Sequence, residues 1–314
     1  MKIVFLDSYT VNPKEVNLDR FNQLGDFIHY DRTAPEQVLE RAKGAEIILT
    51  NKVVISTEIM KQLPDLKYIG VTATGYNVVD IAAAKQKGII VTNARNYSSD
   101  AVAQHVIAMM LAFTNRLPEH DNLPKWASQP DFCYYEYTFS ELSGKILGLI
   151  GYGNIAKKVA QLALAFGMKV LVYKPNPLLD NIEGVSQTDF ESLLEKSDFV
   201  SLHCPLNREN EKLMDSKAFE KMKKTAILLN TARGGLINET DLKNALENDI
   251  IAGAYLDVLT LEPPQVNHPF LGLKNCKISP HIAWASIEAR NRLMNIVFEN
   301  IRMFQEGKPQ NVIE

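Results

Sequence analysis

The chain has 314 residues, of which 46% are hydrophobic and 23% are charged, and its formal net charge is −3. This length is enough for two domains of ordinary size, and the composition is typical of a soluble globular protein. The slight acidic excess argues against a general nucleic-acid-binding protein, which carries a basic surplus.

Neither a membrane span nor an export signal is expected. No apolar run approaches the roughly 18–20 residues that cross a bilayer, and the N-terminus MKIVFLDSYT lacks the regions of a secretion signal. The cysteines Cys133, Cys204 and Cys276 lie far apart and show no C-x-x-C spacing. They predict no disulfide framework and no metal site, and they favour a cytoplasmic location.

Strand-like and helix-like segments alternate along the first part of the chain. Apolar runs predict strands at 2–7, 26–30, 46–51, 66–73 and 89–93. The stretches between them predict helices at 35–44, 56–63 and 78–88. This alternation is typical of a parallel sheet covered by helices.

A second series follows a long helix predicted at 98–117. The intervening segment 118–140 is predicted as a loop, and its dense aromatic residues indicate an interface with another subunit. Strands are then predicted at 145–153, 169–173, 199–205, 225–233, 251–258 and 276–281.

A final helix is predicted over 287–305, with Leu293, Val297 and Ile301 on one face. We expect one domain to comprise residues 1–97 plus 286–314 and the other to comprise 98–285.

The most informative short motif is GYGNIA, which follows an apolar strand and opens a helix. It fits the dinucleotide-binding pattern G-x-G-x-x-G/A: Gly151 allows a tight turn, Gly153 lets a pyrophosphate approach, and Ala156 permits close helix–strand packing. The N–H groups at the helix start favour phosphate. A βα turn without a ligand could share the hexapeptide, but the strand–turn–helix context favours a nucleotide site. The helix is predicted to bury Ile155, Val159, Leu162 and Phe166.

The residue expected to determine the preference for NAD or NADP departs from the usual pattern. About 20 positions after the glycines, an acidic side chain normally holds the ribose hydroxyls of NAD. Here Lys174 stands at the end of the next strand. A lysine can pair with the 2′-phosphate of NADP, and it can equally be a solvated surface residue, so both cofactors stay open.

Three polar residues follow successive predicted strands. Arg233 lies in NTARGG, Glu262 in LDVLTLEPP and His281 in SPHIAW. Each residue alone is compatible with a structural role. Because the carboxyl ends of parallel strands converge on the ligand crevice of such sheets, we expect the three to meet in an active site.

These motifs, in this order, resemble the D-isomer-specific 2-hydroxyacid dehydrogenases over nearly the whole chain. The resemblance includes VTATGYNVVD (71–80) and AVAQH (101–105). Within the family, PHIAWAS and the segment 121–135 are most similar to the glycerate dehydrogenase, or hydroxypyruvate reductase, branch. The resemblance implies an α/β fold of two doubly wound parallel-sheet domains, a flavodoxin-like substrate domain and a Rossmann nucleotide-binding domain.

The resemblance also implies an NAD(P)-dependent reduction of a small 2-oxo acid, hydroxypyruvate and also glyoxylate, to the D-2-hydroxy acid, here D-glycerate. His281 would donate the proton, since imidazole titrates near neutral pH. Glu262 would orient His281 and favour its protonated form. Arg233 would bind the substrate carboxylate and polarise the carbonyl group.

Further positions match the family's binding residues. Those implied for the substrate are Thr74, Gly75 and Trp284. For Trp284, a role in packing alone is an equally good explanation. Those implied for the cofactor are Val102, Gly151, Gly153, Asn154, Ile155, Lys174, Cys204, Pro205, Thr231, Ala232 and Asp257. A homodimer formed by the nucleotide domain is implied too. A D-lactate or other D-2-hydroxyacid dehydrogenase, and a non-catalytic NAD(H)-sensing protein on the same fold, remain as alternatives.

Overall fold

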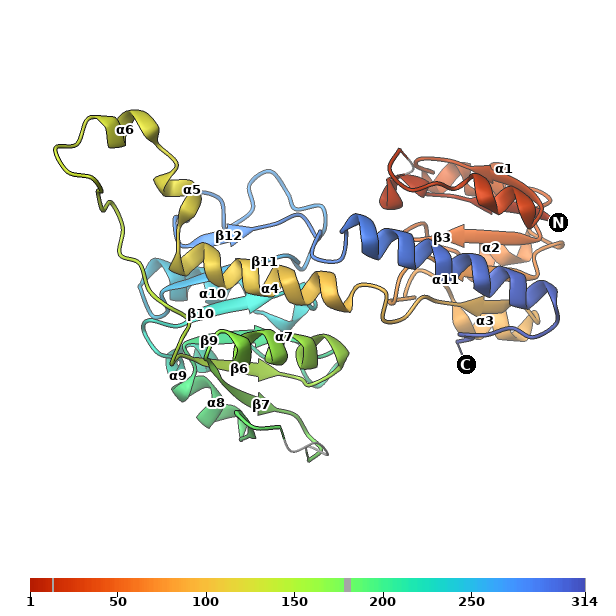
Figure 1. Ribbon diagram of the computed structural model, residues 1–314. Coiled ribbons are helices and arrows are strands. Elements are labelled where there is room, and N and C mark those ends of the chain that lie inside the picture. Colours follow the sequence, from red (N-terminus) through yellow and green to blue (C-terminus); the bar gives the residue numbers. More distant parts are fainter. Residues whose placement is uncertain (13, 178–181, 314) are drawn as a thin grey trace. The chain divides into compact units, whose positions relative to one another are not determined.

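The computed structural model describes residues 1–12, 14–177 and 182–313, and these form two compact units (Figure 1). Unit 1 comprises Met1–Ser98 and Trp284–Glu314, and unit 2 comprises Ser99–Ala283. The sequence places the boundaries at 97/98 and 285/286. Each unit is described by itself below.

Unit 1 is built on a five-stranded parallel sheet of order β2-β1-β3-β4-β5. Its strands are β1 (Lys2–Phe5), β2 (Asp26–His29), β3 (Ile47–Thr50), β4 (Tyr68–Val71) and β5 (Ile90–Thr92). Its helices are α1 (Val38–Ala42), α2 (Thr57–Lys61), α3 (Ile81–Gln86) and α11 (Ile287–Gln305), with 3₁₀ turns η1 (Ser8–Val11), η2 (Asp19–Gln23) and η3 (Pro35–Gln37). All five predicted strands are present, each shorter than predicted.

Both faces of this sheet are covered, which explains why its central strands are continuous apolar runs. On one face, Ile69 and Val71 of β4 pack with residues of α1, α2 and α3. On the other, the ring of Tyr68 lies 4.8 Å from that of Phe304 in α11. The predicted apolar face of α11 is confirmed, because Leu293, Val297 and Ile301 are all buried.

Unit 2 contains a seven-stranded parallel sheet of order β12-β11-β10-β9-β6-β7-β8. Its strands are β6 (Ile146–Ile150), β7 (Lys169–Tyr173), β8 (Val185–Gln187), β9 (Phe199–Leu202), β10 (Ile227–Asn230), β11 (Gly253–Leu256) and β12 (Cys276–Ile278). Its helices are α4 (Ser99–Thr114), α5 (Leu117–His120), α6 (Leu123–Ala127), α7 (Asn154–Ala165), α8 (Phe190–Lys196), α9 (Ser216–Lys221) and α10 (Glu239–Glu247), with the 3₁₀ turn η4 (Gly234–Leu236). The strand order reverses between β6 and β9, as in Rossmann folds. The predicted fold class is confirmed.

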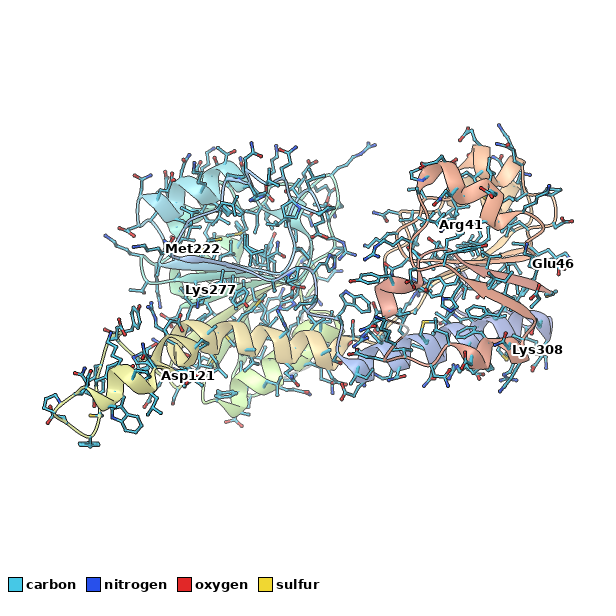
Figure 2. The ribbon with its side chains drawn as sticks, turned by 90° about the horizontal axis from the view of Figure 1, so that it is seen from above. Arg41, Glu46, Asp121, Met222, Lys277 and Lys308 are labelled. Atoms are coloured by element: carbon cyan, nitrogen blue, oxygen red, sulfur yellow. The ribbon has the colours of Figure 1, made fainter. Side chains whose placement is uncertain are left out.

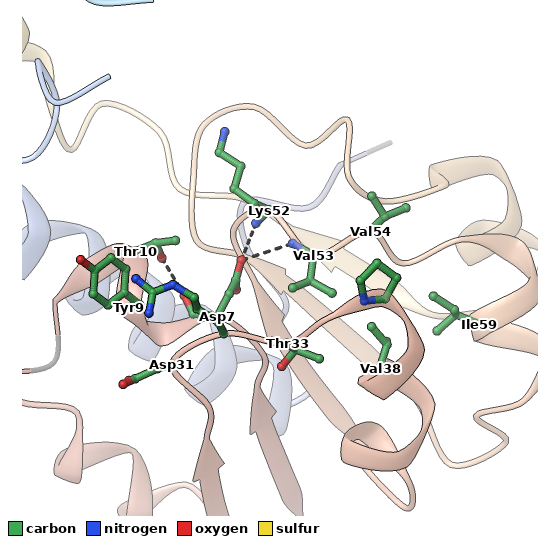
Figure 3. A pocket seen from close by; sticks show the side chains of 12 residues that line it. Asp7, Tyr9, Thr10, Asp31, Thr33, Val38, Lys52, Val53, Val54 and Ile59 are labelled. Carbon is green, nitrogen blue, oxygen red and sulfur yellow. Dashed lines mark hydrogen bonds between the residues drawn. The ribbon is translucent and has the colours of Figure 1, made fainter. Parts of the chain in front are cut away.

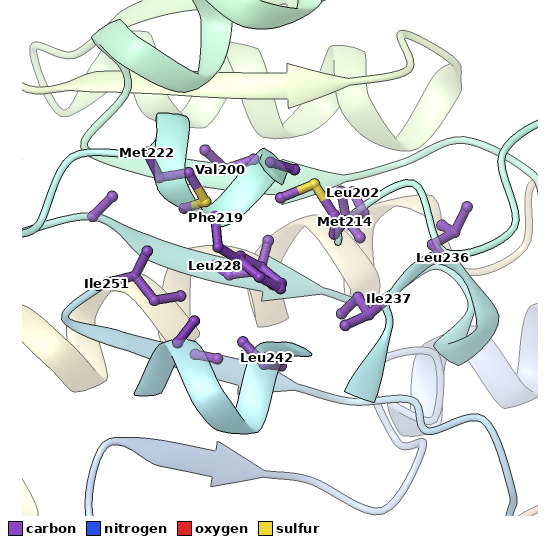
Figure 4. Packing of buried hydrophobic residues seen from close by; sticks show 14 of the residues in the cluster. Val200, Leu202, Met214, Phe219, Met222, Leu228, Leu236, Ile237, Leu242 and Ile251 are labelled. Atoms are coloured by element: carbon purple, nitrogen blue, oxygen red, sulfur yellow. The ribbon is translucent and has the colours of Figure 1, made fainter. Parts of the chain in front are cut away.

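Successive residues of the unit 2 strands point into different cores. Leu228 of β10 packs with α8, α9 and α10, where Phe219 and Leu242 meet it (Figure 4). Ile227 and Leu229 face the other core, which α4 and α7 cover. Because side chains alternate between the two faces of a strand, the same strands contribute residues to the cores on both faces of the sheet.

Capping residues fix where several helices begin. The side chain before the first residue of the helix accepts a backbone N–H one turn later, which satisfies a donor that the helix leaves free. The capping residues are Ser56, Asp80, Asn122, Asp189, Asp215, Asn238 and Ser286.

Three expectations were wrong in detail. Helix α7 does not bury Leu162 and Phe166, which are 38% and 43% exposed. Its buried residues are Ala156, Val159, Ala160 and Ala163, which share a core with buried residues of α4. The predicted loop 118–140 contains α5 and α6, each nucleated by a proline in its first turn. Strand β8 was not predicted, and its three residues are too few for a clear alternation.

Membrane insertion can also be examined in the structure. Across the described residues, no helix combines the length and the apolar character needed to cross a bilayer.

Candidate active site

His281 follows β12 in a backbone conformation that its neighbours impose. Its φ is +54°, in the left-handed region that costs a non-glycine residue about 1–2 kcal/mol. The N–H of His281 donates to the carbonyl oxygen of Asp257 at 2.8 Å. The buried Asp257 carboxylate accepts the N–H groups of Ile282 and Ala283 at 3.0 and 2.8 Å and the Ser279 hydroxyl at 2.6 Å. These bonds compensate the strain and fix the direction of the imidazole.

The imidazole of His281 is paired with Glu262. Nδ1 of His281 lies 2.6 Å from Oε2 of Glu262, and both side chains are about one-third exposed, at 34% and 32%. The other carboxylate oxygen accepts the N–H of Leu259 at 2.9 Å. Since an ionised carboxylate can only accept, the ring proton on Nδ1 is donated to Glu262, and Nε2 is the nitrogen left to exchange a proton. This is the arrangement of an oriented acid–base catalyst.

Arg233 follows β10 on a turn that its neighbours hold in place. The Asn230 side chain donates to the carbonyl oxygen of Arg233 at 2.8 Å and accepts the N–H of Ala232 at 2.9 Å. The guanidinium is exposed and donates to the Ala232 carbonyl oxygen at 2.7 Å. Among the described residues, no carboxylate forms an ion pair with it. Arg233 therefore presents an uncompensated cation that suits an anionic substrate.

A close backbone contact joins the Arg233 turn to the Glu262 loop. A Cβ on Gly234 would lie only 2.0 Å from the carbonyl carbon of Leu259 and 2.3 Å from the nitrogen of Thr260. Strands β10, β11 and β12 are parallel neighbours. The structure thus brings the three predicted residues to one edge of the sheet, with Glu262 and His281 in direct contact.

The glycine-rich turn lies between β6 and β9, where the strand order reverses. Gly151 has a φ of +93°, and a Cβ there would lie 2.8 Å from the backbone of His203 and Cys204. Gly153 precedes α7 with an ordinary φ of −84°, and a Cβ there would have no atom within 4 Å. Gly151 is therefore required by the fold, whereas Gly153 leaves open space before the helix N-terminus. That space suits the pyrophosphate of a dinucleotide.

Other residues implied for the cofactor surround this turn. Asn154 and Ile155 open α7. Lys174 follows β7, whose last residue, Tyr173, accepts the N–H of Gly151 through its carbonyl oxygen at 2.9 Å. The hydroxyl of Thr231, which precedes Ala232, is buried without a hydrogen-bond partner among the described residues. A buried hydroxyl in this state fits a ligand that supplies the partner.

The remaining implied positions have a more structural character. Cys204 and Pro205 follow β9, and burial raises the pKa of the Cys204 thiol, which makes it a poor nucleophile. Val102 is buried in α4. Both oxygens of Asp257 already accept bonds from the loop after β12, so its first role here is to hold His281. His203 is neutral near pH 7, because desolvation of its ring lowers its pKa to about 4.

In unit 1, Thr74 and Gly75 follow β4 at the carboxyl edge of the sheet. Asn93 donates through its side chain to the carbonyl oxygen of Thr74 at 2.7 Å, and the Thr74 hydroxyl donates to that of Ala94 at 2.9 Å. Within the described residues, the N–H groups of Thr74 and Gly75 have no hydrogen-bond partner. The turn is thus held in place with two donors available for an anion.

The same edge carries a cavity of about 550 Å³ beside Lys52, which follows β3 (Figure 3). The buried Asp7 carboxylate accepts the N–H groups of Asn51, Lys52 and Val53 and so fixes this loop. Burial raises the pKa of Asp7, although these backbone bonds act in the opposite direction. The Lys52 amino group is a candidate anion contact.

Trp284, implied for the substrate, belongs to unit 1. Its ring meets that of Tyr97 edge-on, with 6.0 Å between the ring centroids. The structure therefore gives Trp284 a packing partner, and its contact with substrate stays a prediction. Among the described residues, no group of three His, Cys, Asp or Glu side chains is arranged to hold a metal ion.

Sequence reasoning missed two residues of the site. Asn230 holds the Arg233 turn, and its place at the end of the apolar strand β10 was a usable signal, since asparagine often bonds to backbone two residues on. Lys52 also follows a strand, but nothing nearby in the sequence distinguishes it from a solvated lysine.

Comparisons with known proteins identify the family. The sequence model described as "D-isomer specific 2-hydroxyacid dehydrogenase, NAD binding domain" matches residues 107–283. A hydroxypyruvate reductase of Blautia hydrogenotrophica is 43% identical, with 100% of this chain and 99% of the relative covered. A glycerate dehydrogenase of Methylorubrum extorquens is 40% identical, with the same coverage. The solved structure of the acyclic imino acid reductase Bsp5 in complex with NADPH and D-Arg is 34% identical, covers both chains fully and has a TM-score of 0.84.

The two glycines of the turn should respond differently to alanine. Gly151→Ala should lower the melting temperature, because its φ is +93° and the Cβ would meet backbone at 2.8 Å. Gly153→Ala should leave the melting temperature unchanged and weaken nucleotide binding about tenfold or more, because the methyl group occupies the space for the pyrophosphate. Differential scanning fluorimetry and fluorescence titration with NADH or NADPH measure the two effects. Tight binding by a stable Gly153→Ala variant would contradict this assignment.

Proposed function

The chain belongs to the D-isomer-specific 2-hydroxyacid dehydrogenase family, and on this premise we propose that it reduces hydroxypyruvate, and also glyoxylate, with D-glycerate as the product from hydroxypyruvate. Two relatives at 40% identity or more that match the whole chain are a hydroxypyruvate reductase and a glycerate dehydrogenase. The observation that carries the proposal is the 2.6 Å pair of His281 and Glu262 on a sheet edge that also presents Arg233.

In the proposed reaction, His281 supplies the proton that converts the ketone oxygen to a hydroxyl group. A reduced nicotinamide cofactor, when bound, supplies the hydride to the carbonyl carbon. Nε2 of His281 releases its proton to the oxygen, while Glu262 holds Nδ1 and stabilises the positive charge on the ring before transfer. The proton and the hydride together account for the two hydrogens gained by the 2-oxo acid.

In this proposal, Arg233 of unit 2 binds the substrate carboxylate. The planar guanidinium matches a carboxylate and draws electron density from the adjacent carbonyl group. For unit 1 taken by itself, we propose that the turn at Thr74 and Gly75 is an anion-binding element that contacts substrate through its two N–H donors. Lys52 is a further cation at the carboxyl edge of the unit 1 sheet.

For the cofactor, we propose that NADPH is accepted as well as NADH. Lys174 stands where an acidic residue would repel a 2′-phosphate, and a lysine attracts it. The related Bsp5 structure holds NADPH. The three cysteines are free thiols, which fits the proposed cytoplasmic location.

We also propose a homodimer formed by unit 2, with the segment 117–140, here called the arm, at the interface. The arm leaves the end of α4, near the side chain of Asp121 in Figure 2, and carries Phe132 and Tyr135 at 89% and 77% exposure. It is held in shape, because Lys125 pairs with Glu136 at 2.6 Å and the Trp126 ring nitrogen donates to the Phe132 carbonyl oxygen at 3.0 Å. A preorganised, exposed aromatic segment is typical of an interface.

The surface beside the arm is suited to the same role. A cavity of about 650 Å³ is lined by Phe113, Arg116, Tyr137, Lys145 and Lys277, among others. It lies where β6 and β10 begin, and the nucleotide turn lies where β6 ends, so this cavity is not the cofactor site. The lining carries charges of both signs, and Lys277 pairs with Glu119 at 2.8 Å.

His281→Ala should abolish turnover while cofactor binding survives. We expect kcat with hydroxypyruvate to fall by about 10²–10⁴-fold, the usual contribution of a positioned acid–base group. The measurement is NADH and NADPH oxidation at 340 nm, with fluorescence titration for binding and the exposed His29→Ala as control. If the wild-type protein oxidised neither cofactor with any small 2-oxo acid, the proposed function would be wrong.

Lys174→Asp should move the cofactor preference towards NADH. We expect kcat/KM for NADPH relative to NADH to fall about tenfold or more, since tenfold corresponds to only about 1.4 kcal/mol. Lys169→Asp, at the other end of β7, makes the same change of charge and serves as the control. Equal effects of the two substitutions would refute a direct contact of Lys174 with the 2′-phosphate.

Replacing the exposed aromatic residues of the arm should dissociate the dimer. Phe132→Ser combined with Tyr135→Ser removes the two most exposed rings of the arm, so we expect a monomer in sedimentation velocity at micromolar concentration. Phe166→Ser, on the exposed face of α7, is the control and should remain a dimer. A monomeric wild-type protein would overturn the proposal.

A further inference from the structure

The backbone that holds Glu262 is itself held by a residue outside the site described above. Glu239 is the first residue of α10, and its Oε1 accepts the N–H of Thr260 at 2.8 Å. Thr260 is adjacent to Leu259, whose N–H donates to Oε1 of Glu262 at 2.9 Å. Two successive N–H groups of one loop thus bind two carboxylates, Glu239 on one side and Glu262 on the other.

His268 restricts the carboxylate of Glu239. Its Nε2 lies 3.4 Å from Oε2 of Glu239, and the two side chains are only 11% and 20% exposed. Nδ1 of His268 accepts the N–H of Phe270 at 3.4 Å, so the ring proton is on Nε2, facing Glu239. The carboxylate therefore lies between a ring N–H and a backbone N–H, and its position is set by both.

The loop has little freedom to take another path. Gly234 leaves no space for even a Cβ against Leu259 and Thr260, so the loop is packed on the Arg233 turn on that side. Glu239 binds it from the start of α10. Loss of the Glu239 bond would remove the support on the α10 side, so that Thr260 and the adjacent N–H that orients Glu262 could shift away from the Arg233 turn.

We propose that Glu239 is a positioning residue for the acid–base pair: it acts through the Thr260 and Leu259 backbone to hold Glu262 against Nδ1 of His281. Glu239 touches neither reacting atoms nor substrate in this role. The proposal deepens the proposed function, because it concerns the same His281, but the position of Glu262 can be measured without turnover.

The chain supplies a matched control on the same helix turn. Asp241 also lies in the first turn of α10, and its Oδ2 accepts a loop N–H, that of Ser216, at 3.0 Å. Removal of either carboxylate costs one charged hydrogen bond and one favourable charge at the helix N-terminus. Only Glu239 is connected to Glu262, so a purely structural effect would be shared by both residues.

The test compares Glu239→Ala, Glu239→Gln and Asp241→Ala in the full-length protein. The ¹⁵N chemical shifts of the His281 ring, assigned by their loss in His281→Gln, report whether Nδ1 still donates to Glu262. We expect them to change in Glu239→Ala, to stay unchanged in Asp241→Ala, and to return largely to the wild-type values in Glu239→Gln, whose amide oxygen can still accept from Thr260. Melting temperatures should fall in both alanine variants.

The kinetic constants should separate the Glu239 variants in the same way as the ring shifts do. In Glu239→Ala we expect kcat with hydroxypyruvate to fall about tenfold or more with KM little changed, because the acid is displaced while the carboxylate contacts remain. Glu239→Gln should recover most of kcat. If Glu239→Ala does not fold, Glu239→Asp, one methylene shorter, should show the ring-shift change.

Unchanged His281 ring shifts in a folded Glu239 variant, or equal shift changes in Asp241→Ala, would overturn the proposal. The two proposals can fail separately. A wild-type protein without turnover but with the expected ring shifts would reject the proposed function and retain the positioning role of Glu239.

Discussion

The site depends on the way the Asp257 carboxylate holds the loop after β12. His281 has a left-handed backbone conformation that is unfavourable for a histidine, and the N–H groups of Ile282 and Ala283, bound to Asp257, keep it there. Without that constraint, the 2.6 Å contact of His281 with Glu262 would have no fixed direction. The strain is local, and it places one imidazole nitrogen against a carboxylate and leaves the other for a substrate.

Close backbone contacts hold two further loops at the carboxyl edge of the unit 2 sheet, the Arg233 turn and the nucleotide turn. Gly234 lets the Arg233 turn pack directly on the Glu262 loop, and Gly151 lets the nucleotide turn pack on the end of β9. In each case a side chain on the glycine would collide with backbone rather than with a flexible group. The chemistry of the site therefore rests on rigid contacts between loops of neighbouring parallel strands, as is common in catalytic sites on α/β sheets.

Much of this was predictable from the sequence, and the failures have physical causes. The strands and the glycine turn were predictable because apolar runs and G-x-G-x-x-A carry local signals. Leu162 and Phe166 were misplaced because periodicity finds an apolar stripe and cannot tell which face of α7 packs against α4. Asn230 carried a local signal that was not used, whereas Glu239 was missed because it binds the backbone of a loop 21 residues away in the sequence. The direct contact of Glu262 and His281 depends on the order of the strands in the sheet. The motifs indicated that order only through the resemblance to the family.

The central claim is that this edge reduces hydroxypyruvate to one enantiomer, with the proton delivered by a histidine fixed in one direction. The most direct test is chiral analysis of the glycerate formed by the purified wild-type protein from hydroxypyruvate and NADH. The account predicts D-glycerate alone: a fixed acid and a fixed carboxylate contact admit one orientation of the ketone, and membership of the D-isomer-specific family indicates the D product. L-glycerate, a racemic product or no glycerate at all would contradict it.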